Sequence, residues 1–152
     1  MNEHFARIVA ATPGLFVELA RSAPFPARAS ISYKGKAGVY AFFENGQPVH
    51  VGRTRNLQGR LRGHITRSHN SASFAFKQTR HALQRYATYR PEGSRAALTK
   101  DPMFGPEFER QIARVKMMEV HFLEIADSLA QYLLELYAHM EWGLPLDEFD
   151  TH

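Results

Sequence analysis

Residues 38–52, GVYAFFENGQPVHVG, give the strongest local structural signal in this chain. They form two short runs of β-branched and aromatic residues that meet at Asn45 and Gly46. An Asn-Gly pair tolerates the left-handed backbone of a two-residue hairpin turn, so we predict two antiparallel strands joined there. His50 interrupts the second run between two valines, and a glycine and two arginines follow it. An ionisable ring in a strand, just where positive charge begins to accumulate, calls for an explanation.

A short helix with basic side chains is predicted after the hairpin. In TRNLQGRLRGHI, residues 54–65, leucine or isoleucine recurs every fourth residue, and Thr54 or Asn56 can cap the helix. Arg60 and His64 are also four residues apart and lie beside this apolar face. We therefore expect both side chains along the rim where the helix meets the sheet.

The remaining segments predict further helices and one more strand. Residues 3–21 indicate a helix pair, or one helix bent at Pro13 and Gly14, and a proline-bearing loop follows over residues 24–36. Alternation of apolar side chains over residues 118–122 predicts a third strand. Two more helices are predicted over residues 73–86 and 107–116.

A last helix is predicted after Asp127 or Ser128, either of which can act as its N-cap. Gly143 and Pro145 end it. Glu135 falls outside the apolar stripe of this helix, which suits either a solvated residue or a ligand. The predicted buried stripe consists of Leu129, Leu133, Leu136, Tyr137 and Met140.

Length and composition indicate one domain of mixed class. With 152 residues, 44% of them hydrophobic, the chain is long enough for one core, so we expect a single α/β or α+β domain over residues 1–152. Its three-stranded antiparallel sheet would be flanked by helices, with residues 1–33 as an N-terminal helical extension. The chain has no cysteine and no window that resembles a membrane span or signal peptide, which fits a cytoplasmic protein.

The net charge of +4 conceals two blocks of opposite sign. Residues 34–100 carry 13 lysines and arginines against Glu44 and Glu92, whereas residues 101–152 carry 3 basic and 11 acidic side chains. A cationic block interleaved with aromatic residues favours a nucleic acid over a membrane surface as partner, although a solvated basic face gives the same pattern. One face of the helix predicted over residues 73–86 is suited to a phosphate backbone. That face consists of Lys77, Arg80, His81, Gln84 and Arg85.

In this order, the segments resemble the GIY-YIG nuclease superfamily. Its members share a Gly-x-Tyr near the start of a small antiparallel sheet and a Tyr-x-Gly in the adjoining strand. Residues 38–40 match the first motif through Gly38 and Tyr40, and residues 50–52 match the second with His50 in place of tyrosine. The resemblance covers residues 38–152, with residues 65–109 as an insertion-tolerant region.

The resemblance implies roles for several residues. GRTRNLQGRLRGH, residues 52–64, is similar to the family run that holds its catalytic arginine, which corresponds to Arg60. His64 matches a histidine that some restriction enzymes of the superfamily add one turn later. The segment AQYLLELY resembles the one with the metal-binding glutamate, which corresponds to Glu135, and Asp147 stands where the family has an asparagine.

Phosphodiester hydrolysis explains why these residue types belong together. It needs an activated water, a stabilised negative charge and a stabilised leaving group. The resemblance implies that Tyr40 activates water, that Arg60 grips phosphate oxygens as a planar fork, and that Glu135 binds Mg²⁺ or Mn²⁺. His50 can still donate or accept a proton, whereas a carboxylate at Asp147 either strengthens metal binding or repels phosphate. The basic residues expected to contact DNA are Arg53, Arg55, Arg62, Lys77, Arg80 and Arg85.

Three hypotheses of different classes remain open at this point. The first is a metal-dependent DNA endonuclease, for which a homodimer would supply the two active sites of a double-strand cut. The second is a DNA-binding module derived from a nuclease, in which His50 and Asp147 have abolished the chemistry. The third is a protein-interaction domain whose acidic C-terminal third faces the basic block of a second copy.

Overall fold

The structure is a computed structural model that describes residues 1–28, 33–66, 71–84, 98 and 100–146. Within these ranges the chain is α+β, with five helices and one four-stranded antiparallel sheet of order β1-β4-β2-β3. The strands are β1 Phe25–Pro26, β2 Gly38–Glu44, β3 Gln47–Thr54 and β4 Glu119–Glu124. The helices are α1 Glu3–Arg21, α2 Leu57–His64, α3 Ser73–Leu83, α5 Phe104–Lys116 and α6 Ser128–Glu141.

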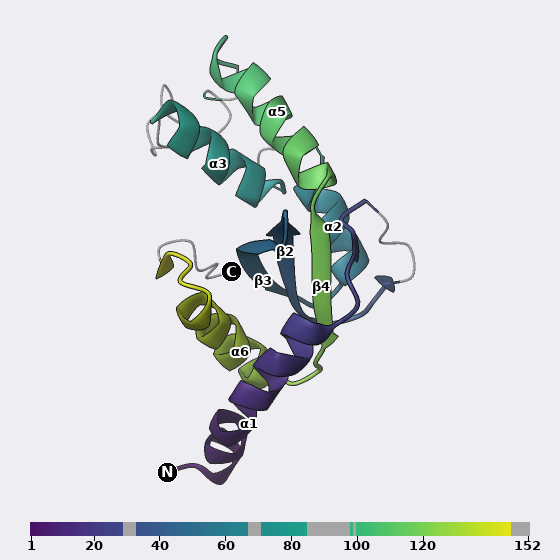
Figure 1. Ribbon diagram of the computed structural model, residues 1–152, viewed down its shortest axis with the longest axis vertical. Helices are drawn as coiled ribbons and strands as arrows, with labels where there is room; N and C mark the ends of the chain where they lie inside the picture. Colours follow the sequence, from purple (N-terminus) through teal and green to yellow (C-terminus); the bar gives the residue numbers. More distant parts are fainter. Residues whose placement is uncertain (29–32, 67–70, 85–97, 99, 147–152) are drawn as a thin grey trace.

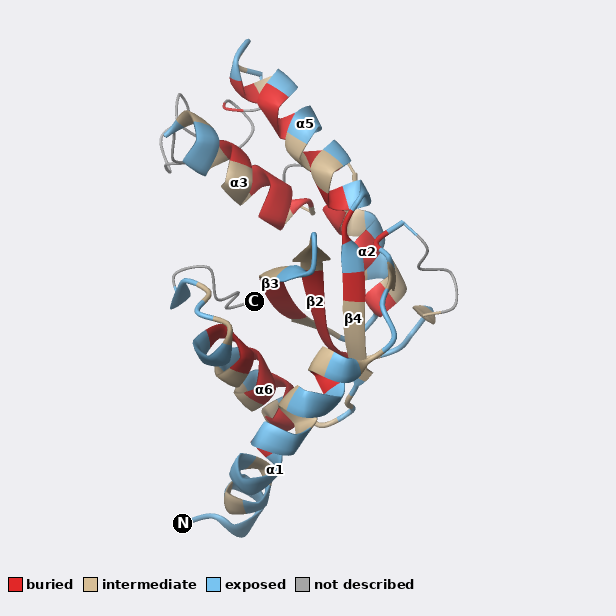
Figure 2. Cartoon of the chain, in the orientation of Figure 1, coloured by how far each residue is buried: buried red, intermediate tan, exposed pale blue. Residues whose placement is uncertain are grey.

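The sheet separates two hydrophobic clusters. One cluster joins β2 to α2, α3 and α5 through large aromatic and aliphatic side chains, including Phe42, Leu61 and Phe74. The other joins the opposite face of β2 and β3 to α1 and α6 through smaller side chains such as Ala41 and Val51. Figure 1 shows the two groups of helices on either side of the sheet. Figure 2 shows that β2 is buried and that α3 and α5 turn buried residues toward each other.

The predicted hairpin is confirmed. Asn45 and Gly46 adopt φ values of 52° and 78°, and Glu44 pairs directly with Gln47 across the turn. The left-handed backbone is the conformation that an Asn-Gly turn favours. Because side chains alternate along a strand, this register fixes which residues of β2 face each helical layer.

The sheet has four strands in the described part of the chain, so the prediction of three strands is wrong. The additional strand, β1, pairs Phe25 with Val120 of β4. Pro24 and Pro26 favoured a loop in the sequence, since proline lacks an amide donor for a strand ladder. An edge strand tolerates this loss on its outer side, and β1 lies at the edge of the sheet.

The N-terminal segment forms one helix rather than a pair. Pro13 lies inside α1, where its ring removes the hydrogen bond that an amide would donate to Val9. The Thr12 hydroxyl donates to the Ile8 carbonyl at 2.7 Å, which satisfies a neighbouring backbone group. None of the helices in the described ranges is long and apolar enough to cross a membrane.

The predicted buried stripe of the last helix is wrong. In α6 the side chains of Leu136 and Met140 are exposed, and the face toward the sheet lies about one residue further round the helix. Hydropathy misplaced this face because half of its residues are polar. The buried residues of α6 are Ala130, Gln131, Leu134, Glu135, Ala138 and His139.

Candidate active site on the sheet

Tyr40, Arg60 and His64 form a hydrogen-bonded cluster on the α2 face of the sheet. The Tyr40 hydroxyl lies 2.7 Å from Nε2 of His64 and accepts a hydrogen bond from Nε of Arg60 at 3.2 Å. Tyr40 is 1% exposed and His64 is fully buried. The side chain of Asn56 caps α2, and Leu57 and Leu61 anchor the helix in the core, so Arg60 and His64 meet the strand as the sequence predicted.

The guanidinium of Arg60 also ties α2 to the start of α3. Its two terminal nitrogens donate to the Ser71 carbonyl at 3.3 Å and to the Ser73 hydroxyl at 2.9 Å. A guanidinium carries five donors in a planar fork, and this fork is already engaged on three sides. The sequence analysis did not identify Ser71 or Ser73, because serines in a polar loop carry no distinctive pattern.

His50 lies on the same face of the sheet as Tyr40. Its ring stacks on Phe42 with centroids 5.5 Å apart, and it is 5.4 Å from the ring of His64 and 4.8 Å from that of Phe74. Neither ring nitrogen has a hydrogen-bond partner among the described residues. A buried polar group without a protein partner is uncommon and costs about 1–3 kcal/mol, so packing alone does not account for a histidine here.

Burial keeps both histidines of the cluster neutral near pH 7. Burial lowers the pKa of His50 well below its usual 6.5, and electrostatic repulsion from Lys77, Arg60 and, to a smaller extent, His139 lowers it further. The pKa of His64 is also well below 6.5, first because of burial and then because of Arg60 and His50. A neutral imidazole can accept a proton at one ring nitrogen.

Two glycines let the strands and the tyrosine approach one another closely. A Cβ at Gly52 would overlap the Tyr40 hydroxyl and would lie 2.9 Å from Cε1 of the same ring. At Gly38 a Cβ would overlap the Leu123 carbonyl oxygen. Glycine at position 38 therefore leaves room for the backbone of β4, and glycine at position 52 leaves room for the Tyr40 ring to lie across β3.

Glu135 lies on the opposite face of the sheet and is paired with a strand residue. Its carboxylate is fully buried, and Oε2 lies 3.2 Å from Nε of Arg53, whose side chain is 16% exposed. The Arg53 guanidinium also lies over the Tyr132 ring at 3.6 Å from its centroid. Glu135 is thus outside the predicted apolar stripe, but it is not solvated, because Arg53 neutralises its charge inside the interface between β3 and α6.

His139 is a further buried ionisable residue of α6. It lies one turn after Glu135 in α6, is almost fully buried, and contributes to the low pKa of His50. Its own pKa is lowered by burial, although hydrogen bonds with the backbone of Val51 and Pro145 act in the opposite direction. A spacing of four residues from Glu135 is the only signal for His139 in the sequence.

The predicted metal ligand, Glu135, is a single carboxylate and lies on the opposite face of the sheet from the cluster of Tyr40, Arg60 and His64. No group of three or more His, Cys, Asp or Glu side chains within the described ranges is arranged to hold a metal ion. Mg²⁺ binds oxygen ligands and keeps several waters, so one carboxylate with water and phosphate matches its chemistry. Glu135 fits as that donor, but its charge is balanced by Arg53, which a cation would have to displace.

The predicted DNA-binding residues that the structure describes are spread over β3, α2, α3 and the loop between β3 and α2. Arg55 and Arg62 are exposed, whereas Lys77 is half-buried. Arg80 is also half-buried, and its guanidinium lies 5.6 Å from the centroid of the Phe76 ring. The predictions at Arg85 and Asp147 lie outside the described residues.

The predicted catalytic residues fall into two groups. Tyr40, His50, Arg60 and His64 lie together on the α2 face, and Glu135 lies with Arg53 on the α6 face. No protein family, no curated protein and no solved structure matches the chain.

Proposed function

We propose that the protein is a nuclease of the GIY-YIG type that hydrolyses phosphodiester bonds in DNA. The observation that supports this most directly is the contact of one buried phenol with both a guanidinium and a neutral imidazole. These three groups can activate water, bind phosphate and accept a proton, which are the functions that phosphodiester hydrolysis requires. The cationic block of residues 34–100 supports DNA as the polyanion.

In this proposal Tyr40 takes the proton of the attacking water. His64, with its own proton on Nδ1, accepts the phenol proton at Nε2 over the 2.7 Å contact. Arg60 donates to the phenol oxygen and so stabilises the phenolate that forms. The low pKa of His64 leaves its imidazole neutral, with an acceptor at Nε2, but also makes it a weak base, so the Arg60 contact has to offset the cost of the proton transfer by stabilising the phenolate.

In this proposal Arg60 binds the scissile phosphate with the two terminal guanidinium nitrogens that donate to Ser71 and Ser73 in the structure. Phosphate oxygens accept stronger hydrogen bonds than a carbonyl or hydroxyl because they are charged. Tyr40 is 1% exposed, so the substrate reaches it only when Arg60 leaves these serines. His50 orients the reacting groups beside Tyr40; its ring nitrogens are buried and have no partner within the described ranges, so they meet the substrate only through the same opening.

Glu135 would hold Mg²⁺ or Mn²⁺. The ion would supply Lewis-acid stabilisation of negative charge on the substrate from the α6 face, across β3 from Arg60. The other roles belong to residues of the chain. Arg53 balances the negative charge of Glu135 before the ion binds, and Arg60 and His64 act on the other face of the sheet. Asp147, which lies outside the described residues, stays a predicted member of the site.

Nicking of supercoiled plasmid in the presence of Mg²⁺ tests the proposal. We expect Tyr40→Phe, Arg60→Lys and Glu135→Gln to lower the rate at least about 100-fold, since each removes a group of the reaction or its geometry. Arg110→Ala, a surface change on α5, serves as the control and should cleave at the wild-type rate. Cleavage that persists unchanged in all three site variants would sink the proposal.

A second candidate is a DNA-binding module that has lost its chemistry. It is favoured because the proposed catalytic groups already bind other residues of the chain. Arg60 donates to Ser71 and Ser73, and Glu135 is paired with Arg53. Such a module binds DNA with steep salt dependence but does not cleave it. Binding without nicking in either Mg²⁺ or Mn²⁺ identifies this candidate, whereas salt-independent association excludes both. A homodimer stays a prediction, which light scattering with and without DNA measures directly.

A further inference from the structure

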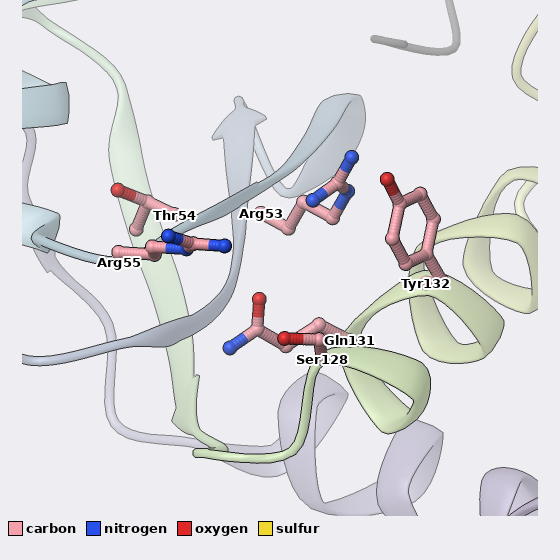
Figure 3. Close-up of a pocket in the computed structure, with 6 residues that line it drawn as sticks. All are labelled: Arg53, Thr54, Arg55, Ser128, Gln131 and Tyr132. Carbon is pink, nitrogen blue, oxygen red and sulfur yellow. The ribbon is translucent and has the colours of Figure 1, made fainter. Parts of the chain in front are cut away.

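A pocket lies where the end of β3 meets the start of α6. It has a volume of about 390 Å³. Figure 3 shows its side chains converging from the strand end and from the first turns of the helix. The residues that line it are Arg53, Thr54, Arg55, Ser128, Gln131 and Tyr132. The pocket is on the α6 side of the sheet, apart from the cluster of Tyr40, Arg60 and His64.

The pocket combines two guanidinium groups with hydroxyl groups. Arg53, near the end of β3, and Arg55, in the bend that follows the strand, both line the pocket. Ser128 and Tyr132 are four residues apart on α6, so their hydroxyls lie on one face of the helix. The amide nitrogen of Gln131 donates to the Ile125 carbonyl at 2.6 Å, which fixes this side chain as part of the wall.

The charge in the pocket comes chiefly from Arg55. Arg53 is engaged by Glu135 and by the ring of Tyr132, whereas Arg55 is exposed and makes no ion pair with any residue in the described ranges. No carboxylate is among the residues that line the pocket. The nearest helix-cap carboxylate, Asp127, accepts from the amide of Ala130 and pairs with His4. The pocket is therefore a positively charged recess.

We infer that this pocket binds a phosphate group of the nucleic-acid substrate, separate from the scissile phosphate at Arg60. Arg55 supplies the planar fork that matches phosphate oxygens, Ser128 adds a hydroxyl, and Tyr132 holds Arg53 in place beneath. The inference rests on the proposed function, and it specifies the path of the substrate. The bound strand passes the outer edge of β3, with one phosphate on each side of the sheet.

NMR of the full chain tests the site without reference to cleavage. The probes are a short single-stranded oligodeoxynucleotide and inorganic phosphate, and the readout is the side-chain Nε–Hε signal of each arginine. We expect the oligonucleotide to shift the Arg55 signal at concentrations that leave the signal of Arg7, an exposed arginine on α1, unchanged. Absence of any Arg55 shift on saturation with the oligonucleotide overturns the inference.

Affinity measurements on variants separate this pocket from the catalytic cluster. We expect Arg55→Ala to weaken oligonucleotide binding about tenfold and to reduce the slope of log affinity against log salt by about 0.7, as for one lost contact with a single strand. Arg55→Lys keeps the slope but loses part of the affinity. Ser128→Ala weakens binding less, and Arg7→Ala is the matched control with no effect. Circular dichroism confirms that each variant is folded.

The outcomes distinguish failure of the pocket from failure of the proposed function. If wild-type protein cleaves DNA while Arg55→Ala and Ser128→Ala bind it unchanged, the pocket inference is wrong and the nuclease stands. If the protein binds the oligonucleotide through Arg55 but does not cleave, the pocket stands and the nuclease fails. A shift of Arg55 by inorganic phosphate alone, with none by the oligonucleotide, overturns the nucleic-acid assignment in favour of a small phosphate-bearing ligand.

Discussion

Arg53 Nε lies 3.2 Å from Oε2 of Glu135, and this pair joins the edge strand to the last helix with almost no solvent access. A buried ion pair is weak support for net stability, but removal of one partner leaves an uncompensated buried charge. We predict that Arg53→Met lowers the free energy of unfolding by about 3–5 kcal/mol. Urea denaturation measures the change.

The pair of Glu44 and Arg114 provides the matched control. Its two hydrogen bonds, of 2.7 and 2.8 Å, join side chains that are each about one-third exposed. Solvent screening limits such a pair to about 1 kcal/mol or less, so Arg114→Met should have a much smaller effect than Arg53→Met. The double variant Arg53→Met, Glu135→Leu should recover most of the lost stability. Equal losses for the two arginine variants contradict the prediction.

His50→Phe separates a structural from a functional histidine. Phenylalanine fills the same stacked position against Phe42 and Phe74 and removes two ring nitrogens that have no partner within the described ranges. We predict unchanged or higher stability, by up to about 1–3 kcal/mol, together with impaired DNA cleavage. Thermal unfolding and plasmid nicking are measured on the same preparation. If the stable variant keeps full activity, His50 packs in the core and takes no part in cleavage.

Three buried histidines predict a loss of stability in mild acid. The folded pKa values of His50 and His64 lie well below 6.5 and that of His139 is also lowered, so below pH 6.5 the unfolded chain takes up protons that the folded chain does not. The free energy of unfolding therefore falls as pH decreases from about 6.5, by up to about 1.4 kcal/mol per pH unit for each histidine. It should be flat above this range. Urea denaturation at closely spaced pH values measures the slope.

Carboxylate titration is the main competing cause and occurs at lower pH. Arg114 holds the pKa of Glu44 below 4.5, and a backbone hydrogen bond from Ala130 holds that of Asp127 below 3.8. Stability from these groups is lost only as pH falls through still lower values. His50→Phe should remove about a third to a half of the slope between pH 6.5 and 5.5, since it removes one of three buried histidines with a lowered pKa. Stability that stays constant across that interval in the wild type refutes the assignment.

The local features of the sequence predicted the half of the molecule that surrounds Tyr40. An Asn-Gly turn, alternation along a strand and a repeat of four along a helix act over a few residues, and they correctly placed Arg60 and His64 beside β2. The face of α6 was wrong because its burial depends on distant partners. Arg53 makes a buried Glu135 tolerable, and no window of sequence around Glu135 contains that information.

Tertiary context also explains the missed edge strand and the missed serines. β1 exists because β4 offers it an unpaired edge, which overrides the proline signal of Phe25–Pro26. Ser71 and Ser73 became relevant only when α3 folded back on Arg60. In both cases the deciding partner is remote in sequence, so local pattern could not have predicted the contact.

Gly52→Ala tests whether the close approach of β3 to Tyr40 organises the site. The added Cβ would overlap the phenol, so the ring has to shift away from His64 and Arg60 or the strands have to separate. We predict a loss of about 1–3 kcal/mol in the free energy of unfolding, as for other overpacked cores, and a fall in cleavage at least as large as that of Tyr40→Phe.

Gly14→Ala is the control, because its Cβ meets nothing within 4 Å inside α1. Replacement of a helical glycine by alanine should raise stability by about 0.5–1 kcal/mol. If Gly52→Ala instead keeps both stability and the ring signals of Tyr40 unchanged, the strand is free to move. The Tyr40 ring would then not be the reason for a glycine at position 52.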